Sequence, residues 1–226
     1  MSVIESPGVA PRPVRGTSRE ARTPLVLGAV LVPVLLATLV FTPAGRGNWL
    51  LETGPGLLGM AALAATFRRF PMSRWIYVCV FLHVLVLTYG AYYTYALTPL
   101  GNWARDTFHL SRNPYDRLGH FAQGFFPAFI VREVLLRRTP LRPGGWLAFL
   151  TGAVCLAISA CYEFLEWWAA LLLDPAGGDA FLGTQGDIWD AQWDMFMCLV
   201  GASLALAFFS RAHSRSIERL FERSRP

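Results

Sequence analysis

The chain has 226 residues, of which 54% are hydrophobic and only 15% are charged, and its formal net charge is +5. About a quarter of the residues in a soluble domain are charged, so this composition excludes an ordinary soluble domain and is typical of a membrane protein. All 20 basic residues are arginines, and without lysine the chain has no side-chain amine for Schiff-base chemistry. We expect the lipid bilayer as a partner and no nucleic acid.

Apolar runs long enough to cross a bilayer recur along the chain. A transmembrane helix needs about 20 mainly apolar residues. The expected spans cover residues 23–41, 49–67, 75–97, 115–136, 146–173 and 189–209. The sequence therefore predicts an all-α fold, a polytopic transmembrane helix bundle of about six spans.

The expected membrane domain covers residues 24–210, and a tail is expected before it and after it in the sequence. Residues 1–23 contain Pro, Arg and Ser without an apolar period, which predicts a disordered cytoplasmic tail. Residues 211–226 form a basic cytoplasmic tail whose apolar residues share one helical face. That pattern fits a short helix lying on the membrane surface.

The arginines predict the orientation. Sixteen of the 20 lie in the two tails, in the connections that follow the second and fourth spans, and at the end of the fourth span, all on one side of the membrane. The opposite side keeps Arg46, Arg105, Arg112 and Arg117. Because cytoplasmic loops carry the excess of positive charge, both termini are expected in the cytoplasm.

Ionisable side chains then gather at the outer ends of three spans. They form three pairs, each on one face of its helix: Asp116 with His120, Glu163 with Glu166, and Asp190 with Asp194. A charge near mid-bilayer costs about 2.5–3.5 kcal/mol, so these groups need a hydrated cavity, protons or a cation. We expect all six around one outward-opening cavity.

These residues suggest two kinds of chemistry. The candidate catalytic residues are His120, Glu163, Glu166 and Asp194. The candidate metal ligands are Asp116, His120, Glu163, Glu166, Asp190 and Asp194. One histidine among carboxylates is an oxygen-rich set that favours Mg²⁺, Mn²⁺ or Ca²⁺ over zinc. The alternative is proton sharing, in which some of the carboxyl groups stay neutral.

A plainer interpretation competes with this one. Acids and tryptophans are common where helices meet the membrane interface, and Asp187 and Asp116 taken singly fit that explanation. It fits Glu163, Glu166 and Asp194 less well, because they have apolar residues on both sides.

Other ionisable residues have simpler expected roles. His83 stands alone in the third span and is expected to be a core histidine. Arg132 and Glu133 are expected to form an ion pair at the cytoplasmic end of the fourth span. His213 has no partner nearby in the sequence. Apart from these residues, the cytoplasmic ends of the third to sixth spans largely lack ionisable side chains.

Three stretches resemble the YjdF-like family of bacterial inner-membrane proteins, whose function is unknown. They are NPYDRLGHFAQGF (113–125), ISACYEFLEWWAALL (158–172) and DAFLGTQGDIWDAQWDMF (179–196). The resemblance covers about residues 75–210 and implies a multi-pass protein of the inner membrane.

The same positions show a fainter similarity to VanZ-like membrane proteins, which are associated with glycopeptide resistance. The first VanZ-like block is matched by Asp116, His120 and Phe121, with Arg117 in place of lysine. The later blocks are matched with Glu166 in place of glutamine, Asp194 in place of asparagine and Met197 in place of glycine.

Three functions remain open. The polar site could belong to an intramembrane enzyme acting on a lipid or lipid-linked envelope substrate. It could bind cations or relay protons in a transporter, or its acids could brace three helices of a structural protein. A transporter needs polar positions that continue to the cytoplasmic side.

Overall fold

The structure is a computed structural model that describes residues 15–172 and 184–223. Regular structure within these ranges is entirely helical, which confirms the all-α prediction. The α-helices are α1 (Ser18–Phe41), α2 (Arg46–Thr66), α3 (Arg74–Tyr93), α4 (Pro99–Phe108), α5 (Tyr115–Phe125), α6 (Pro127–Arg138), α7 (Gly145–Leu172) and α9 (Asp190–Arg223), with a short 3₁₀ helix, η1 (Tyr95–Leu97), before α4.

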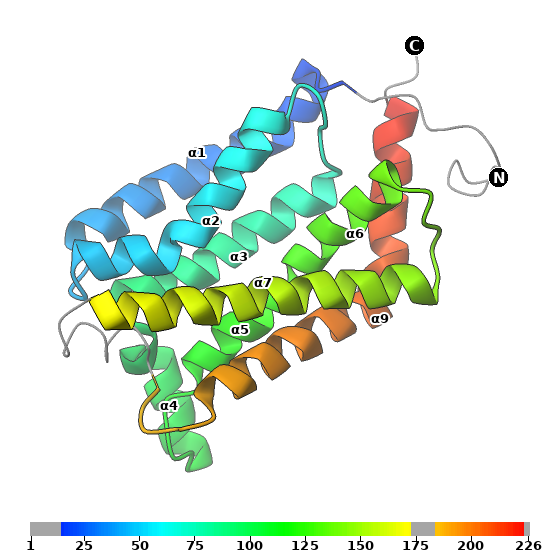
Figure 1. Cartoon of the computed structure of the whole chain (residues 1–226). Coiled ribbons are helices and arrows are strands. Elements are labelled where there is room, and N and C mark those ends of the chain that lie inside the picture. Colours follow the sequence, from blue (N-terminus) through cyan, green and yellow to red (C-terminus); the bar gives the residue numbers. More distant parts are fainter. Residues whose placement is uncertain (1–14, 173–183, 224–226) are drawn as a thin grey trace.

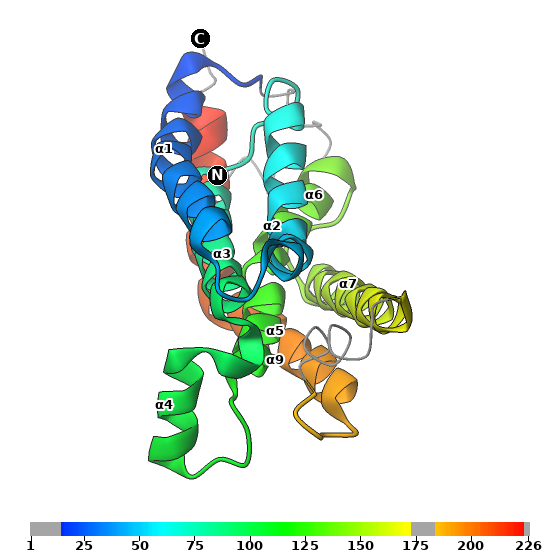
Figure 2. The ribbon, with the colours of Figure 1, turned by 90° about the vertical axis from the view of Figure 1, so that its left-hand side faces the viewer.

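The helices form an elongated bundle (Figure 1). α1 and α2 pack on α3, and α7 runs beside α5, α6 and the first part of α9. The start of α1 and the end of α9 lie at one end of the bundle, whereas α4 and the start of α9 lie at the other (Figures 1 and 2). The three expected pairs of ionisable residues belong to α5, α7 and α9, so the fold can bring them to one depth.

Four of the described helices are long and apolar enough to cross a membrane: α1, α3, α7 and α9. The other two expected spans correspond to α2 and to the pair α5 and α6. α2 contains Glu52 and Pro55, which make it less apolar. The fold is thus a polytopic helical membrane bundle, while the number of six spans stays a prediction.

The fourth expected span is two helices. Pro127 is the first residue of α6, and proline has no N–H with which to continue a helical hydrogen-bond ladder. α5 therefore ends at Phe125 and α6 begins two residues later. The break separates the polar residues of α5 from those at the far end of α6.

α1 begins earlier and α9 ends later than expected. Thr17 and Glu20 form the Thr-x-x-Glu pattern of a helix start, and the Thr17 hydroxyl donates to the Glu20 carboxylate. Residues 18–23 of the expected disordered tail are therefore helical, while residues 1–14 lie outside the described part of the chain. At the other end, Ile217 and Leu220 are buried against the bundle, so this face of the expected surface helix packs on protein.

Two glycines allow α5 and α9 to touch. A Cβ atom at Gly124 would overlap the carbonyl oxygen of Cys198, and one at Gly201 would overlap the carbonyl oxygen of Phe121. Backbones this close are possible only where no side chain intervenes. The contact fixes α5, with Asp116 and His120, against the helix that carries Asp194.

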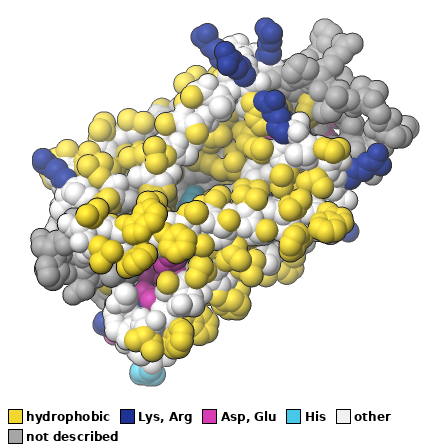
Figure 3. Space-filling view, in the orientation of Figure 1, with side chains coloured by type: hydrophobic (Ala, Val, Ile, Leu, Met, Phe, Trp, Pro, Cys, Tyr) yellow, Lys and Arg dark blue, Asp and Glu magenta, His cyan; other side chains and the backbone are white. Residues whose placement is uncertain are grey.

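The surface separates charge from apolar area (Figure 3). Arginine side chains gather mainly at the end where α1 begins and α6 ends, and apolar side chains cover the flanks. Acidic side chains show between α7 and the start of α9, towards the opposite end. This is the pattern of a protein whose flanks contact lipid.

Candidate functional site

Three helices surround the His120 ring with carboxylates. Asp116 lies one turn earlier on α5, with an oxygen 3.8 Å from His120 Nε2. Asp194 of α9 lies 3.9 Å from the same nitrogen, and Glu163 of α7 lies 3.7 Å from Nδ1. One ligand atom each from Asp116, His120 and Asp194 fall within 4.8 Å of one another. We call these four residues the His120 centre.

Gln123 orients the histidine ring. Its Oε1 atom lies 3.0 Å from His120 Nδ1. An amide oxygen only accepts hydrogen bonds, so this contact makes Nδ1 the protonated donor. In the neutral ring Nε2 then presents its lone pair towards Asp116 and Asp194. A histidine that binds a metal through one nitrogen characteristically donates the other N–H to a carbonyl or carboxylate.

Two carboxylate oxygens of the centre have no hydrogen-bond partner among the described residues. They are Glu163 Oε1 and Asp194 Oδ1, and both atoms are buried. Leaving a buried acceptor unsatisfied costs about 1–3 kcal/mol, and more when the group is charged. These oxygens therefore favour a bound cation, a proton or water at the His120 centre.

Asp190 lies beside the centre and pairs with Arg112. The two side chains are in direct contact, and Arg112 also lies 3.6 Å from Asp116 and 3.9 Å from Asp187. Arg117 adds a second ion pair to Asp187 at 2.6 Å. Asp190, expected as a metal ligand, is thus neutralised by a guanidinium group, and the sequence had suggested no role for Arg112 beyond topology.

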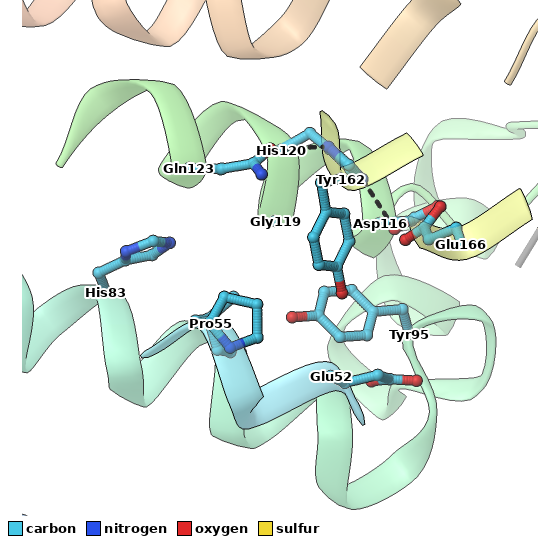
Figure 4. A pocket seen from close by; sticks show the side chains of 11 residues that line it. Glu52, Pro55, His83, Tyr95, Asp116, Gly119, His120, Gln123, Tyr162 and Glu166 are labelled. Atoms are coloured by element: carbon cyan, nitrogen blue, oxygen red, sulfur yellow. Dashed lines mark hydrogen bonds and ion pairs between the residues drawn. The ribbon is translucent and has the colours of Figure 1, made fainter. Parts of the chain in front are cut away.

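Glu166 faces a small cavity next to the centre (Figure 4). The cavity has a volume of about 50 Å³, which is enough for a few water molecules or a hydrated cation but not for a lipid headgroup. Asp116 and His120 line one side of this cavity, and the rings of Tyr95 and Tyr162 cross it. Glu166 is therefore in the same polar region as His120 without contacting its ring.

The cavity contains a carboxylate that the sequence analysis missed. Glu52 of α2 is only 4% exposed; its Oε1 accepts a hydrogen bond from Asn48, and its Oε2 is buried without a hydrogen-bond partner among the described residues. The signal in the sequence was a single acid inside the second apolar run, where an ionisable residue is costly. Four helices thus deliver carboxylates to this region: α2, α5, α7 and α9.

His83 also borders the cavity. Its ring stacks on Phe126 with centroids 5.8 Å apart, and its Nε2 is buried without a hydrogen-bond partner among the described residues. It packs as a core histidine does, but on the wall of the polar region.

A second buried polar cluster lies on α6, away from the His120 centre. Glu133 accepts hydrogen bonds from the Ser73 backbone, from Arg137 and from His213, at 2.7–3.1 Å. Arg132 donates to His213 Nδ1 at 3.0 Å, which leaves the Nε2 proton of a neutral His213 for Glu133.

This second cluster corrects two expectations. Glu133 pairs with Arg137 and His213 rather than with Arg132, and His213 finds its partners 80 and 81 positions away. Ionisable positions therefore do continue towards the expected cytoplasmic side. Between the clusters, Phe125, Phe126 and Phe129 pack among apolar residues.

The helices and their lipid-facing flanks define a multi-pass helical membrane protein with a buried acid and histidine centre. A family model described as "Predicted membrane protein (DUF2238)" matches residues 24–215. The chain is 44% identical over 198 residues to the inner membrane protein YjdF of Escherichia coli (strain K12), covering 87% of this chain and 94% of that protein. The chain belongs to this family, which confirms the resemblance to YjdF-like proteins. No solved structure matches it.

Proposed function

We propose that the protein is an intramembrane enzyme that acts on a lipid or lipid-linked envelope substrate from the outer half of the bilayer. The observation that carries this proposal is the His120 centre, where carboxylates from three helices surround one oriented imidazole and two buried oxygens lack partners. A centre that served only to brace helices would be expected to satisfy its own acceptors.

Asp116, His120 and Asp194 would hold a divalent cation. Their ligand atoms lie close together, Gln123 sets the histidine tautomer, and the carboxylates repel one another unless positive charge or protons intervene. The oxygen-rich set favours Mg²⁺, Mn²⁺ or Ca²⁺. Such an ion would act as a Lewis acid on an oxygen of the substrate.

Glu163 and Glu166 would then supply the acid and base. They lie one turn apart on α7; Glu163 belongs to the centre and Glu166 lines the cavity. Two carboxyl groups in different surroundings can hold different protonation states at the same pH, which is what paired acid–base chemistry needs. The cavity is too small for a headgroup, so only the reacting group of a bilayer substrate would enter it.

A structural role is the second candidate, and one observation favours it. Arg112, in the connection before α5, pairs with Asp190 at the start of α9, and Arg117 of α5 pairs with Asp187. The Gln185 side chain also accepts a hydrogen bond from the Asn113 N–H and donates one to the Asn113 carbonyl oxygen. These contacts join the helices at the outer end of the bundle and need no catalytic role to explain them. They leave the unpaired oxygens of Glu163 and Asp194 unexplained.

Lipid turnover tests the proposal. Purified protein in nanodiscs made from inner-membrane lipids is incubated with Mg²⁺ or Mn²⁺, and the lipids are followed by mass spectrometry. We expect a lipid species to change with wild type and with Cys161→Ser, an exposed position on α7, but not with Glu163→Gln. Lipid profiles that are identical for wild type and Glu163→Gln would contradict an enzymatic role on membrane lipids.

A further inference from the structure

A cleft lined by three arginines opens at the end of the bundle opposite to the His120 centre. It lies where the start of α1, the start of α3 and the last turns of α9 meet. Its lining residues are Glu20, Met72, Arg74, Ser216, Arg219, Leu220 and Arg223. Met72 and Leu220 are buried in the apolar interior, while Arg74 and Arg219 are exposed.

The cleft has an excess of positive charge. Arg74, Arg219 and Arg223 form no ion pair within 4 Å of a carboxylate among the described residues. Arg223 lies near Arg19, Arg74 and Arg219, which repel it, and near Glu20, which attracts it. Glu20 is the one acid among the described residues that line the cleft, and its carboxylate is engaged by the Thr17 hydroxyl. Three guanidinium groups and one carboxylate leave the cleft with net positive charge, which favours binding of an anion.

A hydroxyl group complements the arginines. Arg74 is the first residue of α3, and the N–H groups of its neighbours Ser73 and Trp75 are already bonded to Glu133 and Ser216. The Trp75 N–H donates to Ser216 Oγ at 3.2 Å, which leaves the Ser216 hydroxyl proton free to be donated. Guanidinium groups and a hydroxyl are together donors that bind phosphate oxygens.

We infer that this cleft binds a phosphate group, with Arg74, Arg219, Arg223 and Ser216 as the binding residues. The expected orientation places the cleft at the cytoplasmic leaflet, whose anionic headgroups attract basic segments next to the membrane. The phosphate could belong to an anionic phospholipid or be free in solution, and both sources present the same chemistry to the cleft. The site is independent of the proposed enzymatic role.

A pair of double variants tests this inference. Arg219→Gln with Arg223→Gln removes two guanidinium groups from the cleft. Arg211→Gln with Arg215→Gln is the matched control, because it removes the same charge from exposed positions of the same helix outside the cleft. The ligands are inorganic phosphate, phosphatidylglycerol, phosphatidylcholine, whose phosphate is balanced by a quaternary ammonium group, and diacylglycerol, which has no phosphate. Each is added to protein in detergent and followed by native mass spectrometry and thermal unfolding.

Wild type and the control should retain phosphatidylglycerol over phosphatidylcholine, and the cleft variant should bind it about tenfold more weakly for each arginine removed. Stabilisation by inorganic phosphate alone would support the cleft and show that the phosphate group suffices. Stabilisation only by phosphatidylglycerol would support it with a lipid as the ligand. Equal losses in the two double variants, or wild type that binds phosphatidylglycerol no better than diacylglycerol and is not stabilised by inorganic phosphate, would overturn the inference.

Discussion

His120 is the side chain on which the polar centre depends, because it is the one that contacts all three surrounding carboxylates. Asp116 reaches it from the same helix, whereas Glu163 and Asp194 reach it from α7 and α9. Its orientation depends on Gln123, which accepts from Nδ1 and turns Nε2 towards Asp116 and Asp194. The centre therefore relies on a residue that has no charge of its own.

Replacing Gln123 should weaken a bound cation without unfolding the bundle. Gln123→Leu keeps the size of the side chain but removes the oxygen that selects the tautomer of His120. Loss of such a supporting contact typically lowers metal affinity about 10–100-fold. Titration of the purified variant with Mn²⁺ measures the change. Gln192→Leu, at an exposed position on α9, is the control; equal affinities for the two variants would contradict the role of Gln123.

Pattern and spacing predicted most of the residues at this centre but not their partners. Asp116 with His120, and Glu163 with Glu166, are spaced by helical periodicity, which is a local property of the sequence. The pairing of Asp190 with Arg112 joins residues 78 positions apart, and the entry of Glu52 depends on how α2 packs. Neither contact follows from local spacing.

At the scale of elements, the contact between α5 and α9 positions the centre. Gly124 and Gly201 let the two backbones meet, and α5 ends just before Pro127, the first residue of α6. The sequence predicted a single fourth span here. The proline was present in the sequence, but only packing shows that it separates two polar clusters.

Gly201→Ala should therefore disrupt both the fold and the centre. The added methyl group would overlap the carbonyl oxygen of Phe121 and push α9 away from α5. Overpacking of this kind typically costs about 1–3 kcal/mol. The unfolding temperature in detergent should fall, and Mn²⁺ binding should weaken because Asp194 moves from His120.

Gly152→Ala is the control for this prediction. A Cβ atom there would have its nearest contact at 3.8 Å, with a flexible leucine side chain, so little change is expected. Equal unfolding temperatures for the two variants would contradict the close approach of α5 and α9.

For the whole molecule, composition predicted the class and the arginines predicted the orientation. The described helices form a membrane bundle, yet only four of them are long and apolar enough to cross a membrane. α2 and α5 carry polar residues that line the cavity and make these helices less apolar, and α5 and α6, with 11 and 12 residues, are each too short to cross a membrane alone. Span number was thus hardest to predict where the candidate site is built.

The orientation itself is a testable prediction. A reporter fused after Pro226 should be active only in the cytoplasmic form, because most arginines lie on that side. A fusion truncated after His109, in the connection between α4 and α5, should give the opposite result. A periplasmic signal at Pro226 would place the His120 centre in the other leaflet and the arginine-lined cleft outside.

A divalent cation held by Asp116, His120 and Asp194 would stabilise the whole folded molecule. A ligand that binds only the folded state stabilises it, by about 2.7 kcal/mol at a concentration 100 times its dissociation constant. EDTA should therefore lower the unfolding temperature of the wild-type protein, and one preferred ion among Mg²⁺, Mn²⁺ and Ca²⁺ should restore it. Asp194→Asn should lose this response, whereas Asp106→Asn, an exposed acid on α4, should keep it.

The most direct measurement is elemental analysis of the purified wild-type protein beside His120→Ala, together with unfolding in EDTA. We predict bound divalent metal in the wild type, its loss in His120→Ala, and a melting temperature that falls on chelation and recovers with the preferred ion. Wild-type protein that contains no metal and melts at the same temperature with and without EDTA would contradict the cation and leave proton sharing among the carboxyl groups as the explanation of the centre.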